Sequence, residues 1–255
     1  MIVKKSFNDI FRAPGFSVLS VVFDVLFFFL FGFITGPVRV RLAELATIIA
    51  SSIPSVVEKL DFVTVSKVFF SPDIKPFLFR LLSFVFLFYF LVFVVFVVCQ
   101  GLAWWFAFKI VKPKSFLRFF WSFFRISLFW GVILAVLHFV SVFVDLRFEV
   151  LKKFNPSSVN FLGYFIFALI VISAVLVFFS YLKLRLFAFF KIPFKKSFNV
   201  LFVSFIIIVL IKLLPKLVAK INPTVALVVS FLLTFPGFLF IRVYSINLVK
   251  LKKVE

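Results

Sequence analysis

The chain has few of the residues from which metal sites, disulfides and catalytic centres are built. It contains one cysteine, Cys99, and one histidine, His138, among 255 residues. A single cysteine excludes a disulfide within the chain and a thiolate metal cluster, and a single histidine excludes a metal site made of several histidines. The sequence also lacks a P-loop, a GxSxG motif and an HExxH motif. It therefore predicts no cofactor, no metal and no enzymatic activity.

Long apolar runs fill most of the chain instead. The run from Leu81 to Phe108 holds 28 consecutive uncharged residues, most of them Phe, Val and Leu. As a helix it would be ~42 Å long, which exceeds the ~30 Å hydrocarbon core of a bilayer. The whole chain is 65% hydrophobic, whereas globular proteins are about 45–50% apolar. These features predict an all-α, polytopic helix bundle that forms one membrane domain over residues 1–255.

The apolar runs predict six transmembrane helices and two flanking helices. Residues 4–12 precede the first run and carry Phe7, Ile10 and Phe11 on one side, which is typical of a short interfacial helix. An external amphipathic segment is expected between the first two spans, over residues 37–76. The predicted spans are residues 16–36, 77–108, 119–144, 161–182, 198–214 and 224–248.

Within the external segment, apolar residues recur at three- and four-residue steps between residues 38 and 60. This spacing predicts an amphipathic helix that lies on the membrane surface. Pro54 is expected to bend or divide it. The segment is not predicted to be a seventh span, because its charged residues would be costly in hydrocarbon. These residues are Arg39, Arg41, Glu44, Glu58 and Lys59.

The charge balance predicts the orientation of the chain. The net charge is +20, and basic residues gather at the N-terminus, in loops 109–118 and 183–196, and after the last span. Because loops rich in Lys and Arg stay in the cytoplasm, we expect both termini to be cytoplasmic in the cell membrane. The expected partners are anionic membrane lipids and not nucleic acid. The lysines expected to contact lipid headgroups are Lys5, Lys114, Lys195 and Lys196.

The string Lys-Ser-Phe occurs three times, beginning at Lys5, Lys114 and Lys196. Each copy precedes an odd-numbered predicted span. The pattern is typical of three helix-hairpin repeats. The alternative is that every inner interface of a Phe-rich chain favours a cation, a small residue and an aromatic ring.

Asp24 is the one acidic residue inside a predicted span, and intramembrane carboxylates are functional candidates. Ser17 and Ser20 share its helical face. Arg125 enters the third span from the same side at a comparable depth, which makes an Asp24–Arg125 pair possible. Three interpretations remain open. The pair stabilises the bundle, or Asp24 lines a transport path, or Arg125 reaches the headgroups and leaves Asp24 neutral or hydrated.

Two further groups are candidates for buried polar or transport roles. His138 shares a helical face with Gly131, Ser141 and Asp145, where a hydrogen bond within the bundle is expected more than catalysis. The second group, Thr234, Pro236 and Gly237, is expected to interrupt the sixth span, and transporters place binding sites at broken helices. Helices kinked at proline without any site are the alternative.

The sequence therefore favours a multi-pass membrane protein that acts in transport, as a permease-like subunit without its own nucleotide site. An interfacial helix before six spans resembles permeases that bind a separate ATPase, in architecture alone. A partner subunit or a second copy of the chain is a further open possibility. The alternative function is that of a non-transporting membrane scaffold or lipid-interacting protein.

Overall fold

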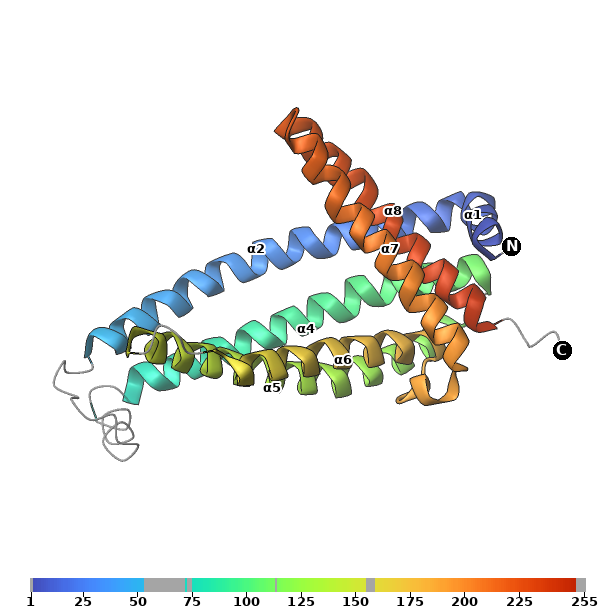
Figure 1. The fold of residues 1–255 in the computed structure, drawn as a ribbon. Coiled ribbons are helices and arrows are strands. Elements are labelled where there is room, and N and C mark those ends of the chain that lie inside the picture. The colour runs from blue at the N-terminus through green and yellow to red at the C-terminus, as the bar shows by residue number, and fades with distance from the viewer. Residues whose placement is uncertain (1, 53–71, 73–74, 113, 155–158, 251–255) are drawn as a thin grey trace. The chain divides into compact units, whose positions relative to one another are not determined.

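A computed structural model describes residues 2–52, 72, 75–112, 114–154 and 159–250, and these residues are helical almost throughout (Figure 1). The predicted all-helical fold is confirmed. One short 3-10 helix, η1, spans Ala188–Lys191. The α-helices are α1 (Ile2–Arg12), α2 (Pro14–Ser52), α4 (Lys75–Val111), α5 (Phe116–Phe154), α6 (Phe161–Lys183), α7 (Phe194–Ala219) and α8 (Pro223–Lys250).

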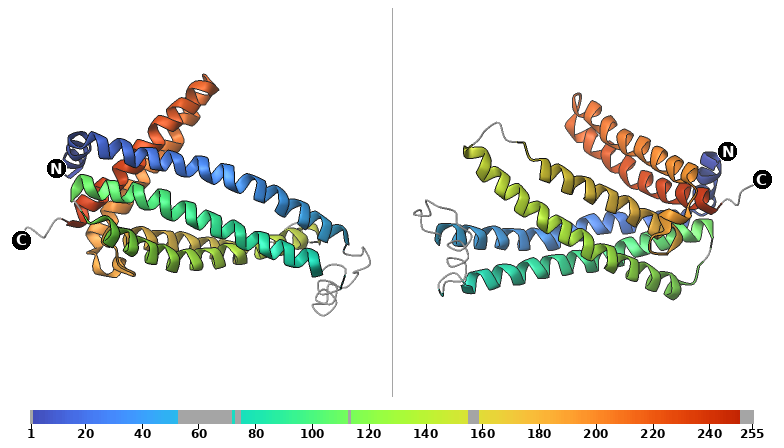
Figure 2. Two further views of the ribbon diagram at one scale, coloured as in Figure 1. Left: turned by 180° about the vertical axis from the view of Figure 1, so that it is seen from behind. Right: turned by 60° about the horizontal axis from the view of Figure 1, so that its bottom comes forward.

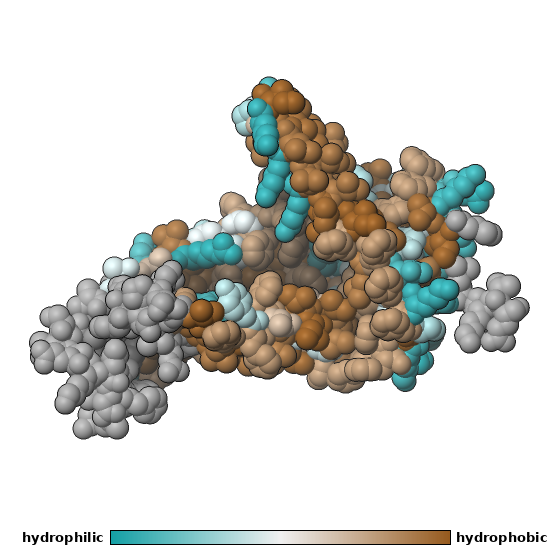
Figure 3. Space-filling view, in the orientation of Figure 1, coloured by the Kyte–Doolittle hydropathy of each residue, from teal (hydrophilic) through white to brown (hydrophobic). Residues whose placement is uncertain are grey.

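Six of these helices are long and apolar enough to cross a membrane, as predicted. Their outer surfaces carry large apolar side chains, such as Phe161, which is 78% exposed, and Phe194, which is 80% exposed. Figure 3 shows apolar side chains covering much of the α7–α8 hairpin. Such surfaces are stable against lipid chains and costly against water. The chain is therefore a multi-pass membrane protein.

The helix that contains the first span does not end where the span is predicted to end. Helix α2 continues through Gly36 and Pro37 to Ser52, so residues 37–52 are continuous with the helix of the first span and do not form a separate helix. A Cβ on Gly36 would meet nothing within 4 Å, so nothing crowds this turn, and the missing N–H of Pro37 costs one helical hydrogen bond. Arg41 and Glu44 form an exposed ion pair at 2.7 Å. Residues 53–71, 73 and 74, which include Pro54, lie outside the described residues.

The chain divides into two compact units. The smaller unit, residues 26–98, contains the middle of α2 and the first part of α4. Within it the rings of Phe27 and Phe96 meet edge to face with centroids 6.0 Å apart. The guanidinium group of Arg39 lies 5.9 Å from the centroid of the Phe88 ring. Aromatic contacts therefore link the two helices of this unit.

The larger unit, residues 1–25 and 99–255, contains the hairpins α5–α6 and α7–α8. In this unit α2, α5 and α7 begin, and α4, α6 and α8 end, at one end, which we call the basic end (Figure 2). Helix α1 packs on α8 there. Asn247 of α8 donates hydrogen bonds to Ser6 and to the carboxylate of Asp9. The start of α1 and the end of α8 therefore lie at the same end, as six spans require.

Helix α8 has a buried half and an exposed half. Its last turns, from Leu239 to Leu248, are buried, whereas Leu227 and Leu232 in its first half are more than 60% exposed. The predicted interruption at Thr234–Gly237 is wrong, because α8 continues through Pro236 to Lys250. Pro236 removes one hydrogen bond without ending the helix. Pro236 and Gly237 mark the boundary between the two halves.

Candidate functional site

A charged cluster is buried in the larger unit, where α2, α4 and α8 meet. Asp24 of α2 is 0% exposed and Arg242 of α8 is 6% exposed. Gln100 of α4, the single glutamine of the chain, completes the cluster. All three residues lie inside helices that are apolar enough to span a membrane.

The face of α2 that carries Asp24 is held against α4 by a serine that precedes it. Ser17, Ser20 and Asp24 recur at three- and four-residue steps and so share one helical face. The hydroxyl of Ser20 donates a hydrogen bond to the carbonyl oxygen of Ala103 in α4 at 2.9 Å. The hydroxyl of Ser17 bonds within its own region, to the carbonyls of Ile10 and Ala13. The Ser20 bond holds α2 against α4 one turn from the carboxylate.

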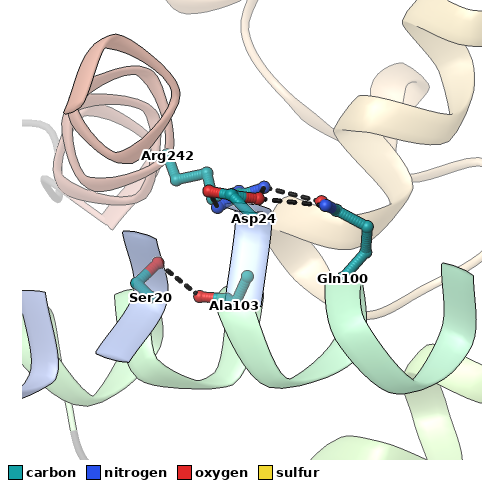
Figure 4. Close-up of polar contacts among 5 residues, drawn as sticks. All are labelled: Ser20, Asp24, Gln100, Ala103 and Arg242. Carbon is teal, nitrogen blue, oxygen red and sulfur yellow. Dashed lines mark hydrogen bonds and ion pairs between the residues drawn. The ribbon is translucent and has the colours of Figure 1, made fainter. Parts of the chain in front are cut away.

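The carboxylate of Asp24 receives hydrogen bonds from both partners (Figure 4). Nη1 of Arg242 donates to Oδ2 of Asp24 at 2.6 Å, and Nη2 donates to Oδ1 at 2.7 Å. Nε2 of Gln100 donates to the same Oδ1 at 3.0 Å. Such two-pronged contacts between guanidinium and carboxylate are the strongest form of charged hydrogen bond.

Gln100 also accepts a hydrogen bond from the cation. Nη2 of Arg242 donates to Oε1 of Gln100 at 2.7 Å, so the amide bonds both members of the ion pair. The guanidinium carbon of Arg242 lies 5.5 Å from the centroid of the Trp104 ring, within cation–π distance. The opposite charges of Asp24 and Arg242 balance each other, and the amide group of Gln100 bonds to both of them.

The three residues lie at similar depth from the basic end. Asp24 is ten residues from the start of α2, Gln100 is eleven from the end of α4, and Arg242 is eight from the end of α8. At 1.5 Å per residue these distances are ~15, ~17 and ~12 Å, about half the thickness of a hydrocarbon core. The cluster is therefore expected near the middle of the bilayer.

The predicted partner of Asp24, Arg125, is wrong. Arg125 is exposed on α5, and its guanidinium carbon lies 5.8 Å from the centroid of the Trp121 ring. Its depth from the start of α5, ~14 Å, is similar to that of Asp24, but its side chain points to the outer surface. The Asp24 carboxylate bonds Arg242 instead.

Sequence reasoning missed Arg242 and Gln100. Arg242 is the one charged residue within the predicted span 224–248. A cation in a span requires a partner as much as an acid does, so that signal was available. Gln100, a polar amide within the predicted span 77–108, also indicates a buried partner, although less strongly than a charge does.

The other predicted polar candidates lie outside this cluster. His138 is exposed on α5. Asp145 accepts hydrogen bonds from Ser141 at 3.4 Å and from Asn160 at 3.1 Å. Thr234 and Gly237 are half-buried and Pro236 is exposed. The structure therefore brings together Asp24 and Ser20 from the predicted set, with Ser17 close by on α2.

The four lysines that are predicted to contact lipid lie at the basic end, in or next to α1, α5 and α7. Lys5 is exposed on α1, and Lys114 is half-buried before α5. Lys195 is exposed and Lys196 is half-buried at the start of α7. Their contact with lipid stays a prediction.

The three Lys-Ser-Phe strings have different surroundings. Ser6 is buried and bonds Asn247, whereas Ser115 is exposed. Ser197 is 2% exposed, and its hydroxyl has no hydrogen-bond partner among the described groups. The first string lies inside α1, the second spans the start of α5, and the third lies in the first turn of α7. The hairpin repeat stays a prediction.

Over the part of the chain that the structure describes, no three His, Cys, Asp or Glu side chains group as metal ligands would. Comparison of the chain with family models, curated proteins and solved structures gives no match. A functional assignment must therefore be argued from the buried cluster itself.

Proposed function

We propose that the chain is a permease-like transport protein in which the cluster of Asp24, Gln100 and Arg242 acts as a gate. The observation that carries the proposal is a two-pronged ion pair buried at the expected middle of the bilayer. Charged side chains at this depth are costly, and in membrane proteins they mark pathways and switches.

A purely structural role would not require charges at this position. Well-packed apolar residues hold helices together as well as a buried ion pair does, and often better. A gate, in contrast, needs a contact with two discrete states. In the closed state of the gate the ion pair is intact. In the open state α8 has separated from α2, and each charge faces solvent or substrate.

The hairpin that carries Arg242 is suited to such a movement. A Cβ on Gly237 would lie 2.7 Å from Cδ1 of Ile211, so glycine lets α7 and α8 pack closely. We expect the two helices to move as one body. Arg242 on this hairpin bonds Asp24 on α2 and Gln100 on α4, so movement of the hairpin would break the cluster.

The alternative, a scaffold or lipid-interacting protein, is favoured by the aromatic surface of α7. The rings of Phe194, Phe198 and Phe202 stack in sequence and are each more than 50% exposed. This surface would hold the protein in lipid in either case. The two functions differ in whether a solute crosses the membrane through the protein. A scaffold would carry no such flux.

The test uses the full chain reconstituted in sealed vesicles that contain a pH-sensitive dye. A potassium diffusion potential drives protons inward, and the change in dye fluorescence reports the leak. The double variant Asp24→Asn, Arg242→Gln is expected to raise this leak about tenfold, because the open state is then no longer a minor population. Arg125→Gln, which changes an exposed arginine, is the control.

A double variant that unfolds at the wild-type temperature but leaks no more than wild-type protein would contradict the gate. A rise of equal size in Arg125→Gln would contradict it as well, because loss of any arginine would then suffice. Vesicles without protein set the baseline for all three samples.

We also propose that the basic end faces the cytoplasm, as the positive-inside rule requires. Cys99 is 2% exposed and can be replaced by alanine to give a chain without cysteine. In that background we expect a membrane-impermeant maleimide to label Thr47→Cys in intact cells and to leave Lys195→Cys unlabelled until the cells are opened. The reverse pattern would contradict the orientation.

A further inference from the structure

A cluster of lysines at the basic end surrounds one buried aromatic ring. Nζ of Lys114 lies 4.3 Å from the centroid of the Phe108 ring, and Nζ of Lys250 lies 5.6 Å from the same centroid. Phe108 is 1% exposed, so this ring is a fixed point in the core of the larger unit. Two ammonium groups from distant parts of the sequence are therefore held close together.

Two more lysines lie near this pair. Lys5 of α1 and Lys112, which directly follows α4, both repel the ammonium group of Lys250, as Lys114 does. Burial lowers the pKa of Lys114, and repulsion by Lys112 lowers it further. We call these four residues, Lys5, Lys112, Lys114 and Lys250, the lysine cluster.

Little negative charge at this end balances the lysine cluster. Among the described residues of the basic end, Asp9 is the one acid, and its carboxylate accepts a hydrogen bond from Asn247 at 2.9 Å. Asp24 lies deeper in the spans and bonds Arg242. Converging like charges without a counter-ion is unfavourable, so the arrangement favours an anion among the lysines.

We propose that the lysine cluster binds the phosphate group of an anionic phospholipid. Its position explains why a lipid is the occupant. Lys112 and Lys114 directly follow the apolar helix α4, and Lys250 ends the apolar helix α8. The ends of such helices are expected at the level of the lipid headgroups. Each lysine at this level attracts an anionic headgroup by about 1 kcal/mol.

Aromatic residues hold the cluster at this level. Nε1 of Trp105 donates a hydrogen bond to the backbone carbonyl of Lys114 at 3.4 Å, and the Trp105 ring meets that of Phe116 edge to face. Lys109 lies 4.4 Å from the centroid of the Trp105 ring. Tryptophan is enriched at membrane interfaces, so this contact places Lys114 beside the headgroups.

The test measures thermal unfolding of the purified full chain in detergent against increasing short-chain lipid. We expect dioctanoyl phosphatidylglycerol to raise the unfolding temperature and dioctanoyl phosphatidylcholine to raise it much less. The variant Lys114→Gln, Lys250→Gln is expected to bind phosphatidylglycerol about 30-fold more weakly, because each lysine contributes roughly fivefold. Without lipid this variant should unfold no earlier than wild-type protein, since it relieves repulsion within the cluster.

The matched control is Arg185→Gln, Lys191→Gln, which removes the same charge from two exposed cationic residues of the basic end. It is expected to keep wild-type affinity for phosphatidylglycerol. Equal loss in both double variants would mean that diffuse charge attracts the lipid, and would overturn the site. Equal effects of the two lipids would do the same. Stabilisation by inorganic phosphate alone at the same concentrations would assign the site to a free anion and overturn the lipid.

Discussion

Replacing Arg242 by alanine is expected to lower the free energy of unfolding by about 3–5 kcal/mol, because it leaves the buried carboxylate of Asp24 without its cation. Asp24→Ala should cost a similar amount by leaving the guanidinium unpaired. The double variant should cost less than the sum of the two, since neither charge then remains. Reversible unfolding of the three variants in mixed detergent, compared with wild-type protein, measures the coupling.

Gln100 and Arg125 provide the controls for this cycle. Gln100→Leu removes the amide that bonds both charges but leaves the ion pair, so we expect a loss of about 1.5–3 kcal/mol, typical of a hydrogen bond to a charged group. Arg125→Ala changes an exposed arginine and should stay within about 0.5 kcal/mol. Losses for Asp24→Ala and Arg242→Ala that simply add in the double variant would show that the two side chains do not interact.

The residues of this cluster also show what the sequence can predict. Depth along a span can be counted, because each residue adds 1.5 Å to a helix. Asp24 was identified in this way, since an acid in a long apolar run requires an explanation. The number of spans follows from the same physics, because hydrophobic length is a property of one segment and needs no knowledge of its neighbours.

The lateral order of helices cannot be counted in this way. Arg125 and Arg242 both lie at depths comparable with that of Asp24, and the sequence does not say which of α5 and α8 lies beside α2. That choice depends on packing between segments far apart in the chain, such as the bond from Ser20 to Ala103. The end of α2 was missed for a related reason. Proline is tolerated inside a membrane helix, so Gly36-Pro37 does not by itself end one.

The aromatic residues present the same difficulty. The chain has 48 phenylalanines, and composition does not distinguish those that face lipid from those that pack inside. The structure separates them. Phe123 is 0% exposed and stacks on Tyr181 with centroids 4.4 Å apart, whereas Phe161 is 78% exposed. Inside a membrane both environments are apolar, so hydropathy gives them the same score and only packing tells them apart.

Trp104 is a buried aromatic residue at which the difference between packing inside and facing lipid should affect stability. Its ring lies 5.7 Å from that of Phe178 and 5.8 Å from that of Tyr181, both on α6, and it also covers the guanidinium group of Arg242. Trp104→Ala is expected to cost about 3–5 kcal/mol, the usual range for a large aromatic residue removed from a packed core. In lipid the loss comes from lost van der Waals contacts and the cavity, because exposure to lipid chains is not itself unfavourable.

Trp121→Ala is the matched control, since Trp121 is 59% exposed on α5. It removes the same side chain from a surface that faces lipid and should cost less than about 1 kcal/mol. Trp104→Phe should recover part of the loss, because a smaller ring still fills some of the cavity between α4 and α6. Unfolding in mixed detergent measures all three variants. If Trp104→Ala and Trp121→Ala cost the same, the ring of Trp104 does not join α4 to α6, and the arginine beneath it must be held by the carboxylate and the amide alone.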